Sequence, residues 1–176
     1  MYPQPIFSDI EFDVDGSMIL GFMDRLGHQL GNKNYPITGT SPLISTISGG
    51  DILRAYLEDN GDFTIENNAT AGPLTTLGVG NGEGPGGGEF YNRDVLKDKL
   101  ITSFQHYAET AQGGLLAFWL VQESATTALD PYSTVFNSGG VNWMNNRTGA
   151  VRDPGHMFVP FNKFKYFAFF KSQWFG

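Results

Sequence analysis

The strongest constraint on the fold is a tight-turn sequence between two apolar segments. Residues 51–57 and 63–65 are rich in apolar and β-prone side chains, and the residues between them, 58–62, read Glu-Asp-Asn-Gly-Asp. An Asn-Gly pair readily adopts the positive φ angles that a tight hairpin turn requires. The sequence therefore predicts a β-hairpin over residues 51–66.

Further segments have the character of strands. Residues 10–15 alternate apolar and acidic side chains, which predicts a half-buried strand with Asp13 and Asp15 on its solvent face. The apolar run at 115–121 predicts a strand that is buried on both faces. Residues 157–171 are rich in β-prone aromatic side chains and predict a closing strand.

Two segments raise the question of helix. In residues 17–30, apolar side chains recur at every fourth position, which is typical of a short amphipathic helix, although glycines within the segment disfavour it. The side chains that follow this spacing are Met18, Phe22, Leu26 and Leu30. Residues 93–109 fit a helix or a strand about equally well.

Short strands, closely spaced turn signals and no alternation of strands with helices favour one all-β domain over residues 1–176. We expect an antiparallel β-sandwich or barrel with one or two short helices. Among these folds a jelly roll fits the length and the long loops best.

A glycine-rich loop covers residues 67–89 and carries almost no periodicity. Such long loops in compact domains are usually functional, and this one is expected to be ordered by its neighbours and to lie at an interface. Its candidate interface residues are Gly80, Gly84 and Gly87, followed by Phe90. The pattern G-x-G-x-x-G at 82–87 has neither the preceding strand nor the following helix of a dinucleotide site.

Composition favours association and disfavours nucleic-acid binding. The charged fraction is 16%, where about 25% is typical, so much of the surface must be neutral or apolar. The formal net charge is −7, and the acidic side chains are concentrated in residues 1–66. Nucleic-acid binding depends on clustered Lys and Arg, so we expect no direct sequence-specific contact with DNA or RNA.

No arrangement of residues indicates catalysis, a cofactor or a metal. There is no cysteine, and His28, His106 and His156 are too far apart in sequence to form a paired metal motif. Asp13-Val14-Asp15-Gly16 resembles the start of a calcium loop but lacks its later Glu, so turn formation is the simpler explanation. We therefore expect no catalytic, cofactor-binding or metal-binding residues.

The C-terminal part, residues 157–176, is unusually aromatic. Lys163, Lys165 and Lys171 alternate with rings, so these lysines can face a membrane surface, nucleic acid or solvent. Trp174 and Phe175 near the end are further interface candidates, because large rings are normally covered. The first residues have no signal-peptide pattern, and no apolar run approaches the roughly 20 residues of a membrane-spanning helix.

The C-terminal third resembles single jelly-roll virus capsid proteins. The resemblance rests on a hydrophobic strand at 115–123, a loop at 130–131, a short strand at 134–136, an Asn-Arg turn at 145–147 and a closing strand at 161–171. It implies a structural subunit of a virion that is assembled in the host cytoplasm. Its partners would be copies of itself and other virion proteins. Because the chain begins acidic where many coat proteins carry a basic arm, the resemblance favours tailless icosahedral phages with an inner membrane.

Three alternatives stay open. The first is a capsid decoration protein. The second is a glycan-binding β-sandwich that would present Trp119, Trp143 or Trp174 on one concave face. The third and least favoured is a β-sandwich hydrolase, which would need carboxylates and histidines to converge in a pocket.

Overall fold

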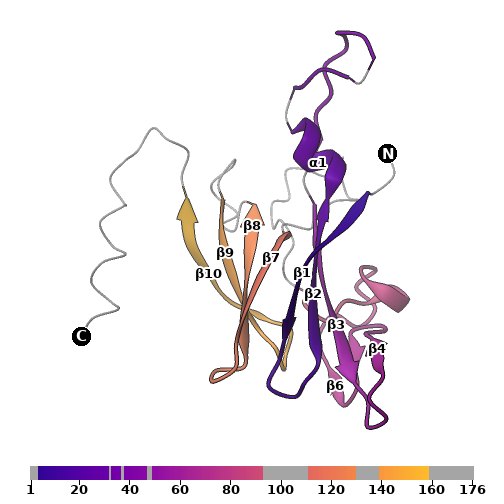
Figure 1. Ribbon diagram of the computed structural model, residues 1–176, viewed down its shortest axis with the longest axis vertical. Coiled ribbons are helices and arrows are strands. Elements are labelled where there is room, and N and C mark those ends of the chain that lie inside the picture. The colour runs from indigo at the N-terminus through magenta and orange to yellow at the C-terminus, as the bar shows by residue number, and fades with distance from the viewer. Residues whose placement is uncertain are drawn as a thin grey trace, which may run out of the picture.

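The protein is represented by a computed structural model that describes residues 4–31, 33–36, 38–46, 49–92, 111–129 and 139–158. Residues 129 and 152–158 are described by their backbone. Figure 1 shows two antiparallel sheets side by side, one formed by the first part of the chain and the other by the last.

The first sheet has four strands in the order β1-β2-β3-β4. Its strands are β1 (Pro5–Phe12), β2 (Met18–Asp24), β3 (Asp51–Leu57) and β4 (Phe63–Ile65). The second sheet also has four strands, in the order β10-β9-β8-β7. Its strands are β7 (Ala111–Phe118), β8 (Glu123–Leu129), β9 (Gly139–Asn145) and β10 (Val151–Phe158). In each sheet, therefore, consecutive strands are neighbours.

Small elements connect or flank these sheets. A short helix, α1 (Arg25–Leu30), follows β2, and the Asp24 carboxylate caps it by accepting from the Gly27 N–H. A two-stranded ribbon, β5 (Thr70–Ala71) and β6 (Leu74–Thr75), and a 3-10 turn, η1 (Pro85–Gly87), lie in the segment after β4.

The two sheets meet where β1 and β2 lie against β7 (Figure 1). Glycines make this close approach possible. A Cβ atom on Gly21 would lie 2.6 Å from the Gly113 carbonyl oxygen, and one on Gly50 would collide with the carbonyl oxygens of Phe22 and Ala111. Because the colliding atoms are backbone, no side-chain movement would relieve the overlap.

Hydrogen bonds from side chains join the sheets along this contact. The Ser8 hydroxyl donates to the Gly113 carbonyl oxygen at 2.8 Å, and the Leu115 N–H donates to the Asp9 carboxylate at 2.8 Å. Farther along, the Trp119 indole N–H donates to the Phe12 carbonyl oxygen at 2.8 Å. These bonds satisfy polar backbone groups of strands that are not paired to each other in a ladder.

A single apolar core links both sheets and the loop after β4. Its fully or almost fully buried members are Ile19, Ile52, Ala71, Phe90, Tyr91, Ala111 and Met144. The rings of Phe90 and Tyr91 lie edge to face with their centroids 5.1 Å apart, a favourable arrangement.

The structure confirms the all-β antiparallel class with short helical elements, and its two layers fit a β-sandwich. The hairpin predicted at 51–66 is also confirmed, because β3 and β4 pair antiparallel. In the turn, the Glu58 N–H donates to the Asp62 carbonyl oxygen, and Gly61 adopts a φ of 88°. The strand order described above shows no Greek-key crossover within either sheet, and the jelly roll stays a prediction.

Three local predictions were wrong. The helix expected over residues 17–30 is strand β2 up to Asp24, and only Arg25–Leu30 is helical. Residues 115–121 do not form one buried strand, because β7 ends at Phe118 and a turn exposes Leu120 completely. The strand expected over residues 10–15 ends at Phe12, and residues 13–17 form the turn into β2. The strand predicted at 134–136 and the ambiguous segment 93–109 lie outside the described residues.

Candidate functional site

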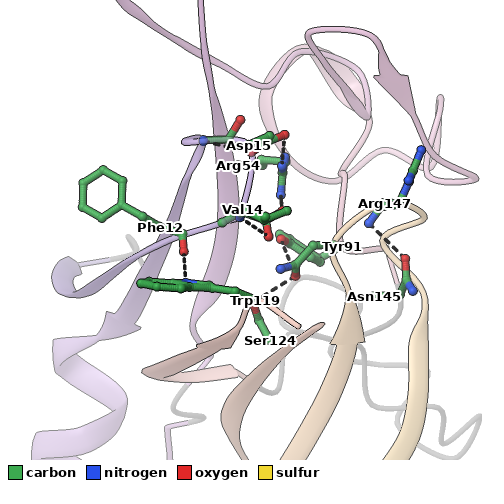
Figure 2. Close-up of polar contacts among 12 residues, drawn as sticks. Phe12, Val14, Asp15, Arg54, Tyr91, Trp119, Ser124, Asn145 and Arg147 are labelled. Carbon is green, nitrogen blue, oxygen red and sulfur yellow. Dashed lines mark hydrogen bonds and ion pairs between the residues drawn. The ribbon is translucent and has the colours of Figure 1, made fainter. Parts of the chain in front are cut away.

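The inner face of the first sheet, the face toward the second sheet, carries a buried arginine. Arg54 lies on β3 with no exposed surface, and its guanidinium forms ion pairs with Asp13 at 2.9 Å and with Asp15 at 2.8 Å. Both carboxylates come from the turn between β1 and β2, as Figure 2 shows for Asp15. The ion pairs therefore hold this turn over the end of the core.

This arrangement corrects the expectation that the acidic side chains of the first strand face solvent. Asp13 is buried beside Arg54, and the Asp9 carboxylate accepts the Leu115 N–H of the second sheet. The reason is that both carboxylates find partners on the inner side of the sheet. Arg54 pairs with Asp13, and the Leu115 N–H donates to Asp9. A buried charge is tolerated only when it is paired in this way.

The ion pairs shift the acidity of the groups involved. Burial by itself would raise the pKa of Asp15, but the Ser17 N–H and the Arg54 guanidinium outweigh it and lower this pKa. Burial likewise would lower the pKa of Arg54, but Tyr91 and the two aspartates raise it. The guanidinium also lies 5.5 Å from the centre of the Phe90 ring, within the range of a cation–π contact.

Glu66 fastens the glycine-rich loop to β3. One oxygen of its carboxylate accepts from the Arg54 backbone N–H at 2.7 Å, and the other accepts from the Phe90 N–H at 2.8 Å. Burial raises the pKa of Glu66 to about 7, although these two donors oppose the shift. Nearby, burial raises the pKa of Asp51, although the neighbouring Glu89 side chain opposes the shift.

We refer to Arg54, Asp13, Asp15 and Glu66, with the groups bonded to them, as the polar cluster. This cluster extends to the second sheet. The Asn146 side-chain oxygen accepts from the Ser124 hydroxyl at 2.9 Å and from the Tyr91 hydroxyl at 3.3 Å. Figure 2 shows Tyr91 between Arg54 and Ser124. Burial raises the pKa of Tyr91 against the opposing effect of Arg54, which keeps the phenol protonated as a donor.

The polar cluster positions chain segments. Within the described ranges, no three His, Asp or Glu side chains are grouped so that they could hold a metal ion. The principal charged groups, Arg54 and Glu66, are fully buried and already paired with groups of this chain. The cluster therefore connects the β1–β2 turn, β3 and the glycine-rich loop.

The outer face of the first sheet is different, because most of the rows across its strands are apolar. Directly opposed residues on antiparallel strands place their side chains on one face. The apolar rows are Phe12, Met18, Ala55 and Ile65; Ile10, Leu20 and Leu53; and Leu57 and Phe63, and Phe7 and Phe22 form a further row that ends in Asp51. We refer to these side chains as the outer face. The Phe7 and Phe22 rings lie 5.4 Å apart, which confirms that they project to the same side.

Much of the outer face is open to solvent. The exposed fractions are 54% for Phe7, 40% for Ile10, 46% for Phe12, 42% for Phe63 and 43% for Ile65. Contiguous apolar surface of this kind on a soluble domain marks a contact surface or an aggregation hazard. Sequence reasoning missed this face, since the apolar positions of β1 were assigned to the interior.

Three interface residues predicted in the glycine-rich loop lie on the surface. Gly80, Gly84 and Gly87 are exposed and adopt positive φ angles. Bonds within this chain order the loop, because the Gly80 N–H donates to the Asn68 side-chain oxygen and the Ala69 N–H donates to the Gly88 carbonyl oxygen. Contact of these glycines with another chain stays a prediction.

The remaining interface candidates have other outcomes. Phe90 is fully buried in the core beneath Arg54, so its assignment to an interface was wrong. The reason is that Glu66 holds the Phe90 backbone against β3 and turns the ring inward. Trp174 and Phe175 lie outside the described residues, as do Lys163, Lys165 and Lys171. In the part of the chain that the structure covers, no helix has the length and apolar character to cross a bilayer.

Comparison with known proteins finds similarity to two proteins of Dictyostelium discoideum. The chain is 30% identical to colossin-A over 168 residues, which cover 91% of this chain and 1% of colossin-A. It is 28% identical to colossin-C over 153 residues, which cover 84% of this chain and 13% of colossin-C. The chain thus spans only a small part of either relative. No protein-family model and no solved structure matches it.

Proposed function

We propose that this domain is a non-catalytic structural module that works by associating with other protein chains, with the outer face as its contact surface. The observation that carries the proposal is the set of apolar rows across the first sheet, one of which runs through all four strands and which the described chain leaves partly exposed. Covering this surface removes apolar area from water, which favours association by roughly 25 cal/mol per Å² before the costs of binding.

The location of the charged groups supports the same proposal. The inner face contains Arg54 and its aspartates, so the charges that normally keep an exposed sheet face soluble lie inside. The similarity to a short part of colossin-A and colossin-C supports a module that functions beside other parts of a long protein or assembly.

A virus coat protein is the more specific proposal, and it depends on the sequence resemblance in the C-terminal third. A jelly roll would support it. Within that proposal, the partners are copies of the chain and other virion proteins, and the location is the virion. The same outer face would serve equally in a decoration protein.

The proposal is tested by sedimentation velocity of the full chain from about 1 to 100 µM. We expect the mean mass to rise with concentration. We also expect Phe12→Lys, which places a charge at the β1 edge of the outer face, to weaken association at least tenfold. The matched control is Leu77→Lys, because Leu77 is 83% exposed in the glycine-rich loop and lies away from the face. A monomeric wild-type chain at every concentration, or equal effects of the two substitutions, would contradict the proposal.

A further inference from the structure

The outer face is a suitable size for an extended segment. Three strands of seven or eight residues and the three-residue β4 span at most roughly 14 Å by 23 Å, well below the roughly 800 Å² that each partner buries in a standard interface between globular proteins. A globular partner that touched this face alone would bury too little area. A chain segment buries more area in total, because its side chains cover the face and also contact the surface beyond it.

The C-terminal segment of this chain has the side chains that such a face requires. We propose that the outer face binds residues 159–176 of a second copy of the chain. The inference rests on the proposed function, because it names the partner of the same surface. In the sequence, Phe164, Tyr166 and Phe170 share one face of an extended segment. Residues 161–171 would extend roughly 36 Å as a strand, which is enough to cross the outer face.

The charges of the two partners are complementary. Residues 159–176 contain Lys163, Lys165 and Lys171 and no acidic side chain. The turn between β3 and β4, which borders the outer face beside Leu57 and Phe63, carries the exposed Asp59 and Asp62. Lysines beside this acidic turn favour binding of the segment, whereas two outer faces that paired with each other would bring their acidic turns together.

A second copy is a better source of the segment than the same chain. The segment follows β10, which is the edge strand of the second sheet farthest from β7. The first sheet contacts the second through β7, so β10 lies on the side of the second sheet that is away from the first sheet (Figure 1). A segment that leaves one molecule and binds the next makes a head-to-tail contact, which produces rings or chains of subunits.

The experiment uses two full-length variants, each deficient in one half of the contact. The face variant, Ile10→Lys with Ile65→Lys, places charges on the apolar face where the rings of the segment would pack. The segment variant, Phe164→Asp with Phe170→Asp, brings carboxylates to an acidic surface. Far-UV circular dichroism checks that each variant keeps the wild-type fold. If an aspartate variant is unfolded, Phe164→Ser with Phe170→Ser replaces it.

We expect wild type to form species larger than a dimer in sedimentation velocity, and each variant alone to be a monomer at about 50 µM. An equimolar mixture of the variants should form a one-to-one dimer, because the intact segment of the face variant binds the intact face of the segment variant. Only one productive contact exists in that mixture, so the assembly should stop at two subunits.

Each other outcome identifies what fails. If the segment variant associates as well as wild type, the face binds something else, which overturns the inference and leaves the proposed function in place. If both variants are monomeric and their mixture is also monomeric, the two surfaces do not bind each other, and the inference is overturned. If the face variant alone associates like wild type, or wild type is monomeric, both the inference and the proposed function fail.

Discussion

At the residue scale, the unusual feature is an arginine fully buried in the core of a domain of this size. Its ion pairs with Asp13 and Asp15 replace the hydration that the guanidinium loses on folding. Asp13 is almost completely buried, whereas the side chain of Asp15 is 39% exposed. The pair with Asp13 therefore has the stronger electrostatic coupling, because water screens it less.

Arg54→Met should destabilise the fold by about 3–5 kcal/mol, since it leaves Asp13 as a buried charge without its partner. In the background of Asp13→Asn the same substitution should lower the free energy of unfolding clearly less, because no buried carboxylate then loses its partner. Urea denaturation of the two single variants and the double variant measures this coupling.

Arg25→Met is the matched control. Arg25 is exposed and binds the Gln4 side chain, so its loss should cost no more than about 0.5 kcal/mol. Strictly additive effects of the Asp13 and Arg54 substitutions would contradict this account.

Glu66 should make stability depend on pH near neutrality. Its folded pKa of about 7 lies above its usual value of 4.5, so the folded state binds the proton more tightly than the unfolded state. The stabilisation is complete below about pH 4.5 and is lost as the pH rises through about 7, up to about 3 kcal/mol in total. Asp51 acts in the same direction, and Asp15 acts oppositely below its usual pKa of 3.8.

The measurement is the free energy of unfolding at pH 4.5 and pH 7.5. Wild type should be more stable at the lower value, and Glu66→Gln should remove most of that difference even if the variant is less stable overall. Glu58→Gln, a substitution in the β3–β4 turn, serves as the control and should keep the wild-type difference. A Glu66→Gln variant with an unchanged pH dependence would assign the effect to other groups.

At the scale of elements, the hairpin was predictable and β2 was not. The sequence at 58–62 specifies its turn through local backbone preference alone, so no tertiary information was needed. The segment Met18–Asp24 has apolar side chains on both faces, and this pattern does not distinguish a central strand from a helix. Gly21, which argued against a helix, is required because β7 passes directly over it.

The candidate site was less predictable than the fold. Alternation at 10–15 indicated a strand, but β1 ends at Phe12. The buried aspartate of the following turn faces inward because Arg54, forty residues or so farther along the chain, pairs with it. No local pattern shows that an arginine will be buried there. The outer face was equally hidden, because it depends on the register between four strands that are distant in sequence.

A substitution at the contact between the sheets tests whether their close approach is required for stability. Gly21→Ala places a methyl group 2.6 Å from the Gly113 carbonyl oxygen, so the sheets must separate locally, at a cost of about 1–3 kcal/mol or more. Thermal unfolding should show a lower midpoint, and hydrogen exchange should show faster exchange at the Leu115 N–H, which bonds Asp9 across the contact. Gly139→Ala is the control, because a Cβ atom there meets nothing within 4 Å. Equal midpoints for the two variants would mean that the close approach is not required.

At the scale of the whole molecule, one core connects two sheets whose strands are separate in sequence. Ile19 and Ile52 come from the first sheet, Ala111 and Met144 from the second, and Phe90 from the loop between them. The ion pairs of Arg54 and the carboxylate of Glu66 add polar links among the same parts. Neither sheet buries its inner face without the other, so the two should not be stable separately.

The chain should therefore unfold in one cooperative transition. In a variant with Trp119→Phe and Trp174→Phe, tryptophan fluorescence reports on the second sheet, since the remaining Trp143 lies on β9, where its ring is 4.8 Å from that of Phe118. Hydrogen exchange of amides in β2 and β3 reports on the first sheet. At low protein concentration, where association is weak, both probes should give the same urea midpoint. In thermal unfolding, the calorimetric and van't Hoff enthalpies should agree. Gly21→Ala should lower both midpoints together, because the contact that it disturbs belongs to both sheets. Two separate transitions, or a first sheet that unfolds while the fluorescence of the second is unchanged, would show that residues 1–176 comprise two independent units.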